Sequence, residues 1–345
     1  MQHDEFFAAL KAGKIENCYL FEGEEEFTKR SALKQLRSKV VDADFAAMNE
    51  STLRDPAPDE LIAAAETLPF MADRRMLLIR ESALLTGNKP KNYDEESAIK
   101  RLTEYFENLP DTTCMVFYVN GKADGRKKFY NLLKKKAAIV QFNQLDEVQL
   151  NKWIARQLQL GGRKITAADC QMLWFTVGKD LNLLSGEIEK LIAYTEGKDT
   201  VDQQDILEIC SQSREYKVFD LSAALLDGDG KKAFVLTEDI LRNGETRLFL
   251  LSLLGSQCRR LYYAAAMRKA GAGDGEMASK LGIPPFALRN TLRQAGKYSL
   301  KELRDMCTWC IDTEFQVKNG ELSEEGSLEQ VMLRILALQK ENGKS

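Results

Sequence analysis

The feature that most constrains this fold is a change of periodicity about 140 residues into the chain. Before it, short apolar runs of strand length alternate with amphipathic stretches of helical spacing. The strand-like segments are residues 18–21, 44–48, 76–80, 114–119 and 139–142. The helical stretches are residues 27–41, 59–67, 96–109 and 126–136. Strands separated by helices favour a parallel sheet with helices on both faces, so this part predicts a doubly wound α/β domain of the nucleotide-binding type.

Beyond residue 142 the pattern is helical throughout, and it contains no further strand signal. A small bundle is expected first, with helices at residues 146–160, 167–176, 180–195 and 202–210. A larger helical region follows, with helices at residues 219–226, 231–241, 245–270, 275–281, 285–297, 300–318 and 327–340. We therefore expect three domains, an α/β domain over 1–142, a small helical domain over 143–212 and a larger helical domain over 213–345. A chain of 345 residues is long enough for this division.

Composition excludes several classes of protein. The 49 Lys and Arg residues against 52 Asp and Glu give a net charge of −3, so no global positive field marks a bulk nucleic-acid coat. The sequence has no apolar run of membrane-spanning length, and its charged start does not resemble a signal peptide. Seven cysteines scattered along the chain do not form a secreted disulfide framework. A cytoplasmic location is expected.

The histidine count restricts chemistry further. The single histidine is His3, beside the chain terminus, where ends usually fray. Catalytic and metal-binding imidazoles must be held rigidly by a second group. We therefore expect His3 to be a solvated bystander, and we exclude histidine-dependent catalysis.

The turn after the first predicted strand can be tested against a phosphate-binding loop. A P-loop needs a second glycine, a lysine and then a hydroxyl residue that binds Mg²⁺. Starting from Gly23, the second glycine position holds Thr28 and the hydroxyl position holds Arg30. Three glutamates at 24–26 would also repel a triphosphate. Lys29 is therefore expected to be an ordinary solvated lysine of the first helical turn.

The third predicted strand lacks the second hallmark of a nucleotide hydrolase. Such strands end in an acidic residue that holds the metal ion, whereas this one ends with Arg80. With both hallmarks lost, the domain is expected to be a nucleotide-type fold without hydrolysis. We predict no catalytic residue, no cofactor and no metal site.

Cys307 and Cys310 form the only C-x-x-C motif. The pair lies in a helical pattern, and neither a second pair nor a nearby histidine completes a zinc site. Buried helix packing is the expected role of both thiols.

A helix-turn-helix-like pattern spans residues 275–297. Residues 250–305 carry 10 Lys and Arg against 4 Asp and Glu, which is enough local charge to meet phosphates. Arg289, Arg293 and Lys297 recur every four residues as possible contacts to a DNA backbone. The alternative is a helical hairpin with a basic exposed face, and the sequence leaves both open.

A short apolar stretch, Leu68, Pro69, Phe70 and Met71, lies between a predicted helix and the third predicted strand. Pro69 cannot continue the helix, so the residues after it are presented at the end of the sheet. The stretch either inserts into a pocket of a partner or packs the loop onto its own core.

Several of these stretches together resemble the delta subunit family of bacterial DNA polymerase III, whose members open the sliding clamp. The matching stretches, which follow one another in the family's order along nearly the whole chain, are 19–25, 68–79, 218–229, 281–286 through 294–295, and 312 with 317–320. The resemblance implies an AAA+-like first domain without a functional P-loop, a helical lid and a C-terminal helical collar. It also implies that partner subunits, rather than this chain, bind ATP.

By the same resemblance, Phe70 and Met71 enter a hydrophobic pocket of the clamp, supported by Leu68 and Pro69. The implied partners are the sliding clamp, the other clamp-loader subunits (ATP-binding and delta-prime type) and primed DNA within the assembly. Two other functions remain to be weighed against this one. A divergent ATPase would bind Mg·ATP tightly by itself, and a DNA-binding regulator would use residues 275–297 on specific duplexes.

Overall fold

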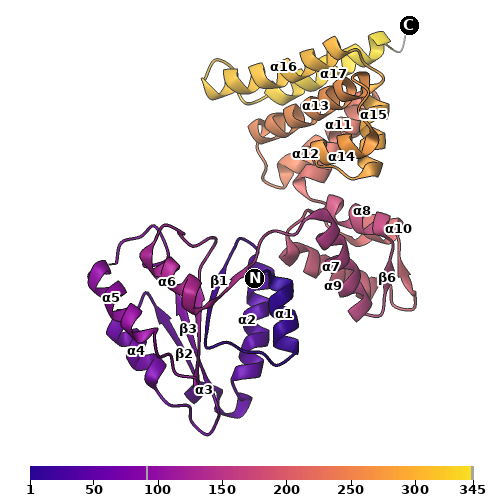
Figure 1. Ribbon diagram of the computed structural model, residues 1–345. Helices are drawn as coiled ribbons and strands as arrows, with labels where there is room; N and C mark the ends of the chain where they lie inside the picture. Colours follow the sequence, from indigo (N-terminus) through magenta and orange to yellow (C-terminus); the bar gives the residue numbers. More distant parts are fainter. Residues whose placement is uncertain (91, 343–345) are drawn as a thin grey trace. The chain divides into compact units, whose positions relative to one another are not determined.

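The computed structural model describes residues 1–90 and 92–342 (Figure 1). The chain forms two compact units, Met1–Glu147 and Val148–Ser345, and each is described by itself. Among the described residues, no helix combines the length and apolar composition that crossing a membrane requires. The predicted division of the second unit at residues 212 and 213 stays a prediction.

The first unit is built on a five-stranded parallel sheet in the order β2-β3-β4-β1-β5. Its strands are β1 (Cys18–Glu22), β2 (Glu50–Arg54), β3 (Arg75–Arg80), β4 (Thr113–Tyr118) and β5 (Ala138–Gln141). The strands β1, β3 and β4 occupy the centre and are almost entirely buried, as continuous apolar runs predict. The predicted α/β fold class is confirmed.

Helices cover both faces of this sheet (Figure 1). One face carries α1 (His3–Lys11) and α2 (Glu26–Val40), and the other carries α4 (Pro58–Glu66), α5 (Glu95–Tyr105) and α6 (Lys128–Lys136). Side chains alternate between the two cores along each strand. In β4, Met115 and Phe117 pack toward α4–α6, whereas Cys114 and Val116 pack toward α1 and α2.

The predicted strand at residues 44–48 is wrong. That segment forms a turn of 3₁₀-helix, η1 (Ala43–Phe45), and the short helix α3 (Ala46–Asn49). Asp42 caps η1 by accepting a hydrogen bond from the Asp44 N–H at 2.9 Å, and the alanines that follow favour helix. The real strand, β2, comes directly afterwards at the edge of the sheet, where its half-exposed side chains give no apolar run.

The expectation of a solvated His3 is also wrong. His3 is buried at the start of α1, and its ring lies 6.4 Å from that of Phe142. The amino group of Met1 donates a hydrogen bond to the Ile139 carbonyl at 2.7 Å. The terminus is held because its backbone pairs with the free edge of β5, through a bridge between Gln2 and Gln141.

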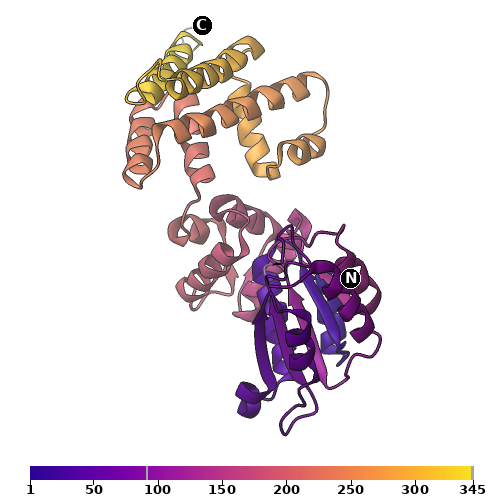
Figure 2. The same ribbon diagram turned by 90° about the vertical axis from the view of Figure 1, so that its left-hand side faces the viewer.

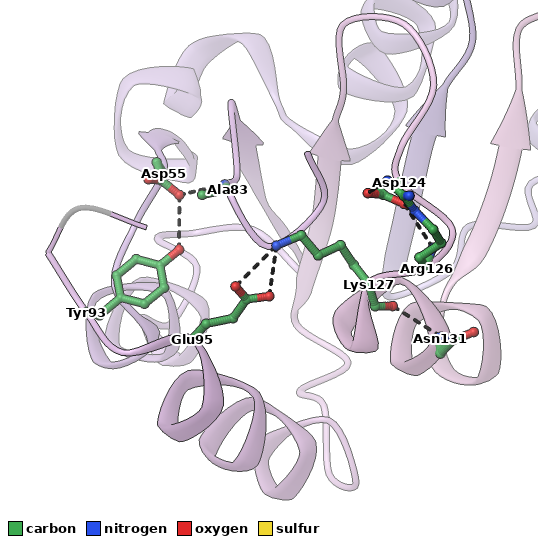
Figure 3. A network of polar contacts seen from close by, with 8 residues as sticks. All are labelled: Asp55, Ala83, Tyr93, Glu95, Asp124, Arg126, Lys127 and Asn131. Carbon is green, nitrogen blue, oxygen red and sulfur yellow. Dashed lines mark hydrogen bonds and ion pairs between the residues drawn. The ribbon is translucent and has the colours of Figure 1, made fainter. Parts of the chain in front are cut away.

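A polar network ties together the connections at the carboxyl end of the sheet (Figure 3). Asp55 accepts hydrogen bonds from the Ala83 N–H at 2.8 Å and from the Tyr93 hydroxyl at 3.0 Å. Burial, together with the Asp55 carboxylate, raises the pKa of Tyr93, so this hydroxyl stays a donor. Glu95 at the start of α5 binds the Lys127 ammonium at 2.9 and 3.2 Å. These contacts fasten Ala83 and Tyr93 to the residue after β2, and Lys127, directly before α6, to the start of α5.

The second unit begins with a small helical bundle. Its helices are α7 (Glu147–Leu160), α8 (Ala167–Val177), α9 (Leu181–Tyr194) and α10 (Gln203–Ile209), close to the predicted ranges. It also contains two short parallel strands, β6 (Lys164–Ile165) and β7 (Thr200–Val201), where no strand was expected. Two residues are too few to leave a periodic signal in the sequence.

The remaining helices are α11 (Arg214–Leu226), α12 (Gly230–Arg242), α13 (Arg247–Lys269), α14 (Asp274–Leu281), α15 (Pro285–Ala295), α16 (Leu300–Lys318) and α17 (Ser327–Asn342). All of them except α14 contribute to one large apolar core, while Met277 of α14 packs with Ile283, Ala287 and Leu288 in a separate, smaller cluster. Cys307 and Cys310 are buried in α16, as expected, and a side chain at Gly255 of α13 would approach the Cys310 Cβ to 3.2 Å. Residues 1–90 and 92–342 contain no cluster of three or more His, Cys, Asp or Glu side chains suited to a metal ion.

Aromatic side chains join the small bundle to the larger helical core within this unit. Phe175 of α8 lies edge-on to Phe219 of α11, with ring centroids 5.2 Å apart, and to Phe286 of α15 at 5.3 Å. Figure 2 shows α14 and α15 (orange) following the C-terminal end of α13. The helix-turn-helix-like element therefore packs on α8 through its own apolar face.

Candidate partner-binding site and the closed nucleotide corner

The carboxyl end of the sheet, where parallel α/β domains bind ligands, is closed by a buried lysine. Lys29 of α2 has no exposed surface. Its ammonium donates hydrogen bonds to the carbonyls of Gly23 at 2.7 Å and Val119 at 2.8 Å, and it pairs with the Glu26 carboxylate at 2.5 Å. The expectation of a solvated Lys29 is therefore wrong. This lysine fastens the ends of β1 and β4 to α2, so its charge is already neutralised and its donors are engaged.

The backbone fills the place of a phosphate-binding loop. Gly23 has φ +122°, and a Cβ there would lie 2.1 Å from the Phe142 carbonyl oxygen. The Gly23 N–H binds the Gly121 carbonyl at 2.8 Å. The start of α2 is capped by its own Glu25, which accepts from the Phe27 N–H at 3.2 Å. A phosphate at this helix start would have to displace a carboxylate.

The end of β3 carries a cation where a hydrolase needs a metal-binding carboxylate. The Arg80 guanidinium lies 4.5 Å from the centre of the Tyr118 ring, and the Lys29 ammonium lies 5.0 Å from it. The Tyr118 hydroxyl donates to the second oxygen of Glu26 at 2.7 Å, and burial raises its pKa. Lys29, Glu26 and Tyr118 are thus joined by an ion pair and a hydrogen bond, and Arg80 packs on the Tyr118 ring. We call these four residues the closed corner.

A cavity of about 370 Å³ lies near the closed corner, and its charged lining residues are Glu22 and Lys122. Its wall includes Glu22, which is buried and accepts hydrogen bonds from the Ala123 N–H and the Tyr130 hydroxyl, both at 3.2 Å. With one carboxylate and one ammonium group, this lining offers a phosphate no net positive charge. The groups that a P-loop would turn toward a phosphate, the Lys29 ammonium and the backbone at Gly23, are engaged within the chain.

The amino end of the same sheet presents the opposite character. Residues 68–71, called here the apolar segment, connect α4 to β3. Leu68 is 76% exposed, Phe70 46% and Met71 74%. Among residues 1–90 and 92–147, the other large hydrophobic side chains with this degree of exposure are Met1 and Met48. The segment is thus not a staple on its own core.

The apolar segment has a fixed backbone despite its exposure. The side chain of Asn49, fully buried at the end of α3, donates to the Phe70 carbonyl at 2.8 Å and accepts from the Phe70 N–H at 2.7 Å. The Phe45 ring lies edge-on to the Phe70 ring at 5.9 Å. Met71 adopts φ +48°, a left-handed conformation that a methionine holds only when its surroundings enforce it.

Two arginines fasten the chain directly after the apolar segment. Arg74 donates to the carbonyls of Asp111 at 2.8 Å and Ile15 at 3.2 Å. Arg75, the first residue of β3, is buried and donates to the Ser51 hydroxyl at 2.7 Å, and its burial lowers its pKa. The exposed side chains are thus held between an ordered helix and an ordered strand.

The three basic residues proposed from the sequence lie along one element of the second unit. Arg289 and Arg293 are exposed on α15, whose other face buries Ala287 and Leu288. Lys297 follows the helix and pairs with Asp227 at 2.7 Å. Of the three basic residues, Lys297 is thus held in an ion pair within the chain, whereas Arg289 and Arg293 are exposed on the face of α15 opposite its buried residues.

Comparisons with known proteins agree with this architecture. The family model described as the DNA polymerase III delta subunit matches residues 19–143, and the model of that subunit's C-terminal domain matches residues 215–335. The chain belongs to the DNA polymerase III delta subunit family. The first match contains both the closed corner and the apolar segment.

Within this family, the DNA polymerase III subunit delta of Bacillus subtilis is 25% identical to the chain over 337 residues, covering 97% of each sequence. A solved structure, the Bacillus subtilis DNA clamp loader delta protein, is similar with a TM-score of 0.58 at 24% identity. It covers 97% of this chain and 99% of its own. The likeness therefore extends over both units of the delta-family chain.

Sequence reasoning located the apolar segment but missed the residues that hold it. Phe45 lies in the stretch predicted as a strand, residues 44–48, and Asn49 directly follows that stretch. The sequence drew attention to Lys29, to the glutamates at 24–26 and to Arg80, because they stand at positions of nucleotide-binding motifs. It did not predict that they contact one another or Tyr118. A pairing such as that of Lys29 with Val119 joins residues 90 positions apart, and a single sequence gives no signal for it.

Proposed function

We propose that this delta-family chain is a clamp-loader subunit that binds the sliding clamp through Leu68, Pro69, Phe70 and Met71 and opens the ring for loading onto primed DNA. The observation that carries the proposal is the apolar segment, which exposes three large hydrophobic side chains in a fixed conformation. Exposed apolar groups with defined geometry are typical of sites that insert into a partner's pocket.

The free energy that the apolar segment can contribute on binding indicates how it would act on the clamp. Burying a large apolar side chain contributes about 1.5–3 kcal/mol, so Phe70 and Met71 together supply a few kcal/mol. That is too little to separate a hydrophobic ring interface outright. It is enough to shift a ring between closed and open forms, provided that the segment binds the open form more tightly.

The chain is proposed to act without ATP chemistry of its own. The closed corner engages Lys29 in internal hydrogen bonds and places Arg80 at the metal position, which argues against the divergent-ATPase alternative. ATP bound to partner subunits would then control when the apolar segment reaches the clamp. The delta-prime and ATP-binding subunits are the proposed neighbours in this assembly, with the helices of 213–345 as the proposed collar.

The test is a clamp-binding titration with Phe70→Ala/Met71→Ala. The purified chain and the sliding clamp encoded in the same genome are the two reactants. We expect affinity to fall at least about 100-fold, because two buried anchors are lost. Leu160→Ala/Leu183→Ala is the matched control, since it removes two exposed leucines from the second unit, 76% and 60% exposed. Unchanged affinity in the first double variant would refute the site.

We also propose that Arg289 and Arg293 contact the backbone of primed DNA within the assembled loader. Support comes from their exposure on one face of α15 and from the local excess of positive charge. Arg289→Ala/Arg293→Ala should weaken binding regardless of base sequence and reduce the salt dependence of binding by about two phosphate contacts. Arg268→Ala/Lys280→Ala is the control, because both of its cations already pair with acids at 2.8 and 2.7 Å. An unchanged salt slope in the α15 variant contradicts this contact.

A further inference from the structure

The apolar segment is held by a residue that itself contacts no solvent. Asn49 has no exposed surface, yet both polar atoms of its side chain bind the backbone of a single exposed residue, Phe70. An asparagine amide has one acceptor and one donor group, so it satisfies a peptide N–H and C=O together, as a neighbouring strand would. The contact joins segments 21 residues apart in the chain.

Three further features show how much of the segment's conformation depends on this contact. The segment belongs to neither α4 nor β3, and therefore has no ladder of backbone hydrogen bonds of its own. Met71, the next residue, sits at φ +48°, which costs free energy for a side chain with a Cβ. Phe45, whose ring lies 5.9 Å from that of Phe70, is the last residue of η1, and Asn49 is the last residue of α3, so two neighbouring short elements contact the same residue.

We propose that Asn49 is the positioning residue of the clamp-binding site, which holds the apolar segment in its binding conformation before the partner arrives. This inference rests on the proposed function. Without Asn49, the backbone around Phe70 samples several conformations, and binding must then order it at a cost in conformational entropy. Asn49 acts through Phe70 and Met71 and makes no contact with the clamp itself.

The arrangement also defines the contact surface more fully. Met48, directly before Asn49, is 59% exposed. Asn49 joins the end of α3 to Phe70, so Met48, the residue before Asn49, is held close to the apolar segment. We therefore expect the partner to offer an apolar pocket for the apolar segment and an apolar surface beside that pocket for Met48.

The experiment measures two quantities for Asn49→Ala. One is its affinity for the sliding clamp encoded in the same genome, and the other is hydrogen exchange of the Phe70 amide in the free protein. We expect affinity to fall about 10- to 100-fold and the Phe70 amide to lose its protection. The matched control is Thr113→Val, which removes another fully buried side-chain bond to backbone, from Thr113 Oγ1 to the Ala65 carbonyl at 2.8 Å. Because that bond ends on Ala65 and not on a residue of the apolar segment, the control should leave both readings near their original values.

The outcomes separate this inference from the proposed function. Wild-type affinity in Asn49→Ala, or equal weakening in Thr113→Val, overturns the positioning role. If Asn49→Ala does not fold, Asn49→Ser replaces it, and full Phe70 protection together with unchanged affinity in that variant overturns the role as well. Clamp binding that survives Phe70→Ala/Met71→Ala instead defeats the proposed function, while the exchange measurement still reports on Asn49.

Discussion

The two ends of the sheet in the first unit differ in what they expose, although a buried polar side chain fixes a loop at each of them. At the carboxyl end, Lys29, Glu26 and Tyr118 bind one another, and Arg80 packs on the Tyr118 ring. At the amino end, the apolar side chains of residues 68–71 are exposed, and two hydrogen bonds from the buried Asn49 side chain hold their backbone at Phe70. In both places a buried polar side chain, Lys29 or Asn49, bonds two backbone groups and fixes a loop.

The difference lies in what remains available to a partner. In the closed corner, the Lys29 ammonium and the Tyr118 hydroxyl already have their hydrogen-bond partners, so an added ligand gains little from either group. The apolar segment leaves Leu68, Phe70 and Met71 in water, so a partner gains free energy by covering them.

The largest expected effect on stability comes from opening the closed corner. Lys29→Ala removes the donor of the Gly23 and Val119 carbonyls and the cation that pairs with Glu26, and it also leaves a cavity. We expect the free energy of unfolding of the first unit to fall by about 2–4 kcal/mol. Denaturant titration of the full chain measures it. A loss below the scatter of such titrations would mean that the corner is not closed by this lysine.

A smaller effect is expected from Tyr118→Phe, which removes one hydroxyl from the same corner. The hydrogen bond to Glu26 contributes about 1 kcal/mol, while the ring that lies beside Arg80 and Lys29 is kept. The same titration should rank this variant between wild type and Lys29→Ala. A loss as large as that of Lys29→Ala would show that the hydroxyl, and not the lysine, organises the corner.

At the other end of the sheet, stability should barely respond. Phe70→Ala/Met71→Ala removes side chains that are already 46% and 74% exposed, so the unfolding free energy should change by less than about 1 kcal/mol. Together with the expected loss of clamp affinity, this would separate binding from folding. A cooperative loss of structure in this variant would instead place the segment in the core.

The smallest response concerns nucleotide binding. Calorimetric titration of the purified chain with Mg·ATP should give no binding isotherm, in the wild type and in Lys29→Ala alike. Turnover of ATP by the wild type that disappears in Lys29→Ala would overturn the comparison between the two ends, because the corner would then be an active site.

The parts of the fold that sequence reasoning predicted well are those with local signals. The strands β1, β3 and β4 carry continuous apolar runs, and the helices of the second unit carry long apolar stripes, so their bounds came within a few residues for most elements. The strand β2 was misplaced because its apolar content is low at the sheet edge. The helix α1 was missed because a charged terminus was taken to fray.

The candidate site divides in the same way. Pro69 marks the apolar segment locally, since it must interrupt the preceding helix. The burial of Lys29 depends on Val119, and the role of Asn49 depends on Phe70, so both arise only once distant segments meet. Polar residues that serve as internal fasteners look like surface residues in a sequence, because lysine and asparagine are mostly exposed in proteins.

The strand β3 joins the two ends directly, and this has a mechanical consequence. Its six residues run from Arg75, just after the apolar segment, to Arg80 in the closed corner, a span of about 20 Å. It is paired on both sides, with β2 and β4. A pull applied at the segment therefore loads two ladders of hydrogen bonds in shear at once, rather than peeling them one by one. A force between the apolar segment and a partner would thus be spread over the pairing of β3 with both β2 and β4, and the first unit should deform little under it.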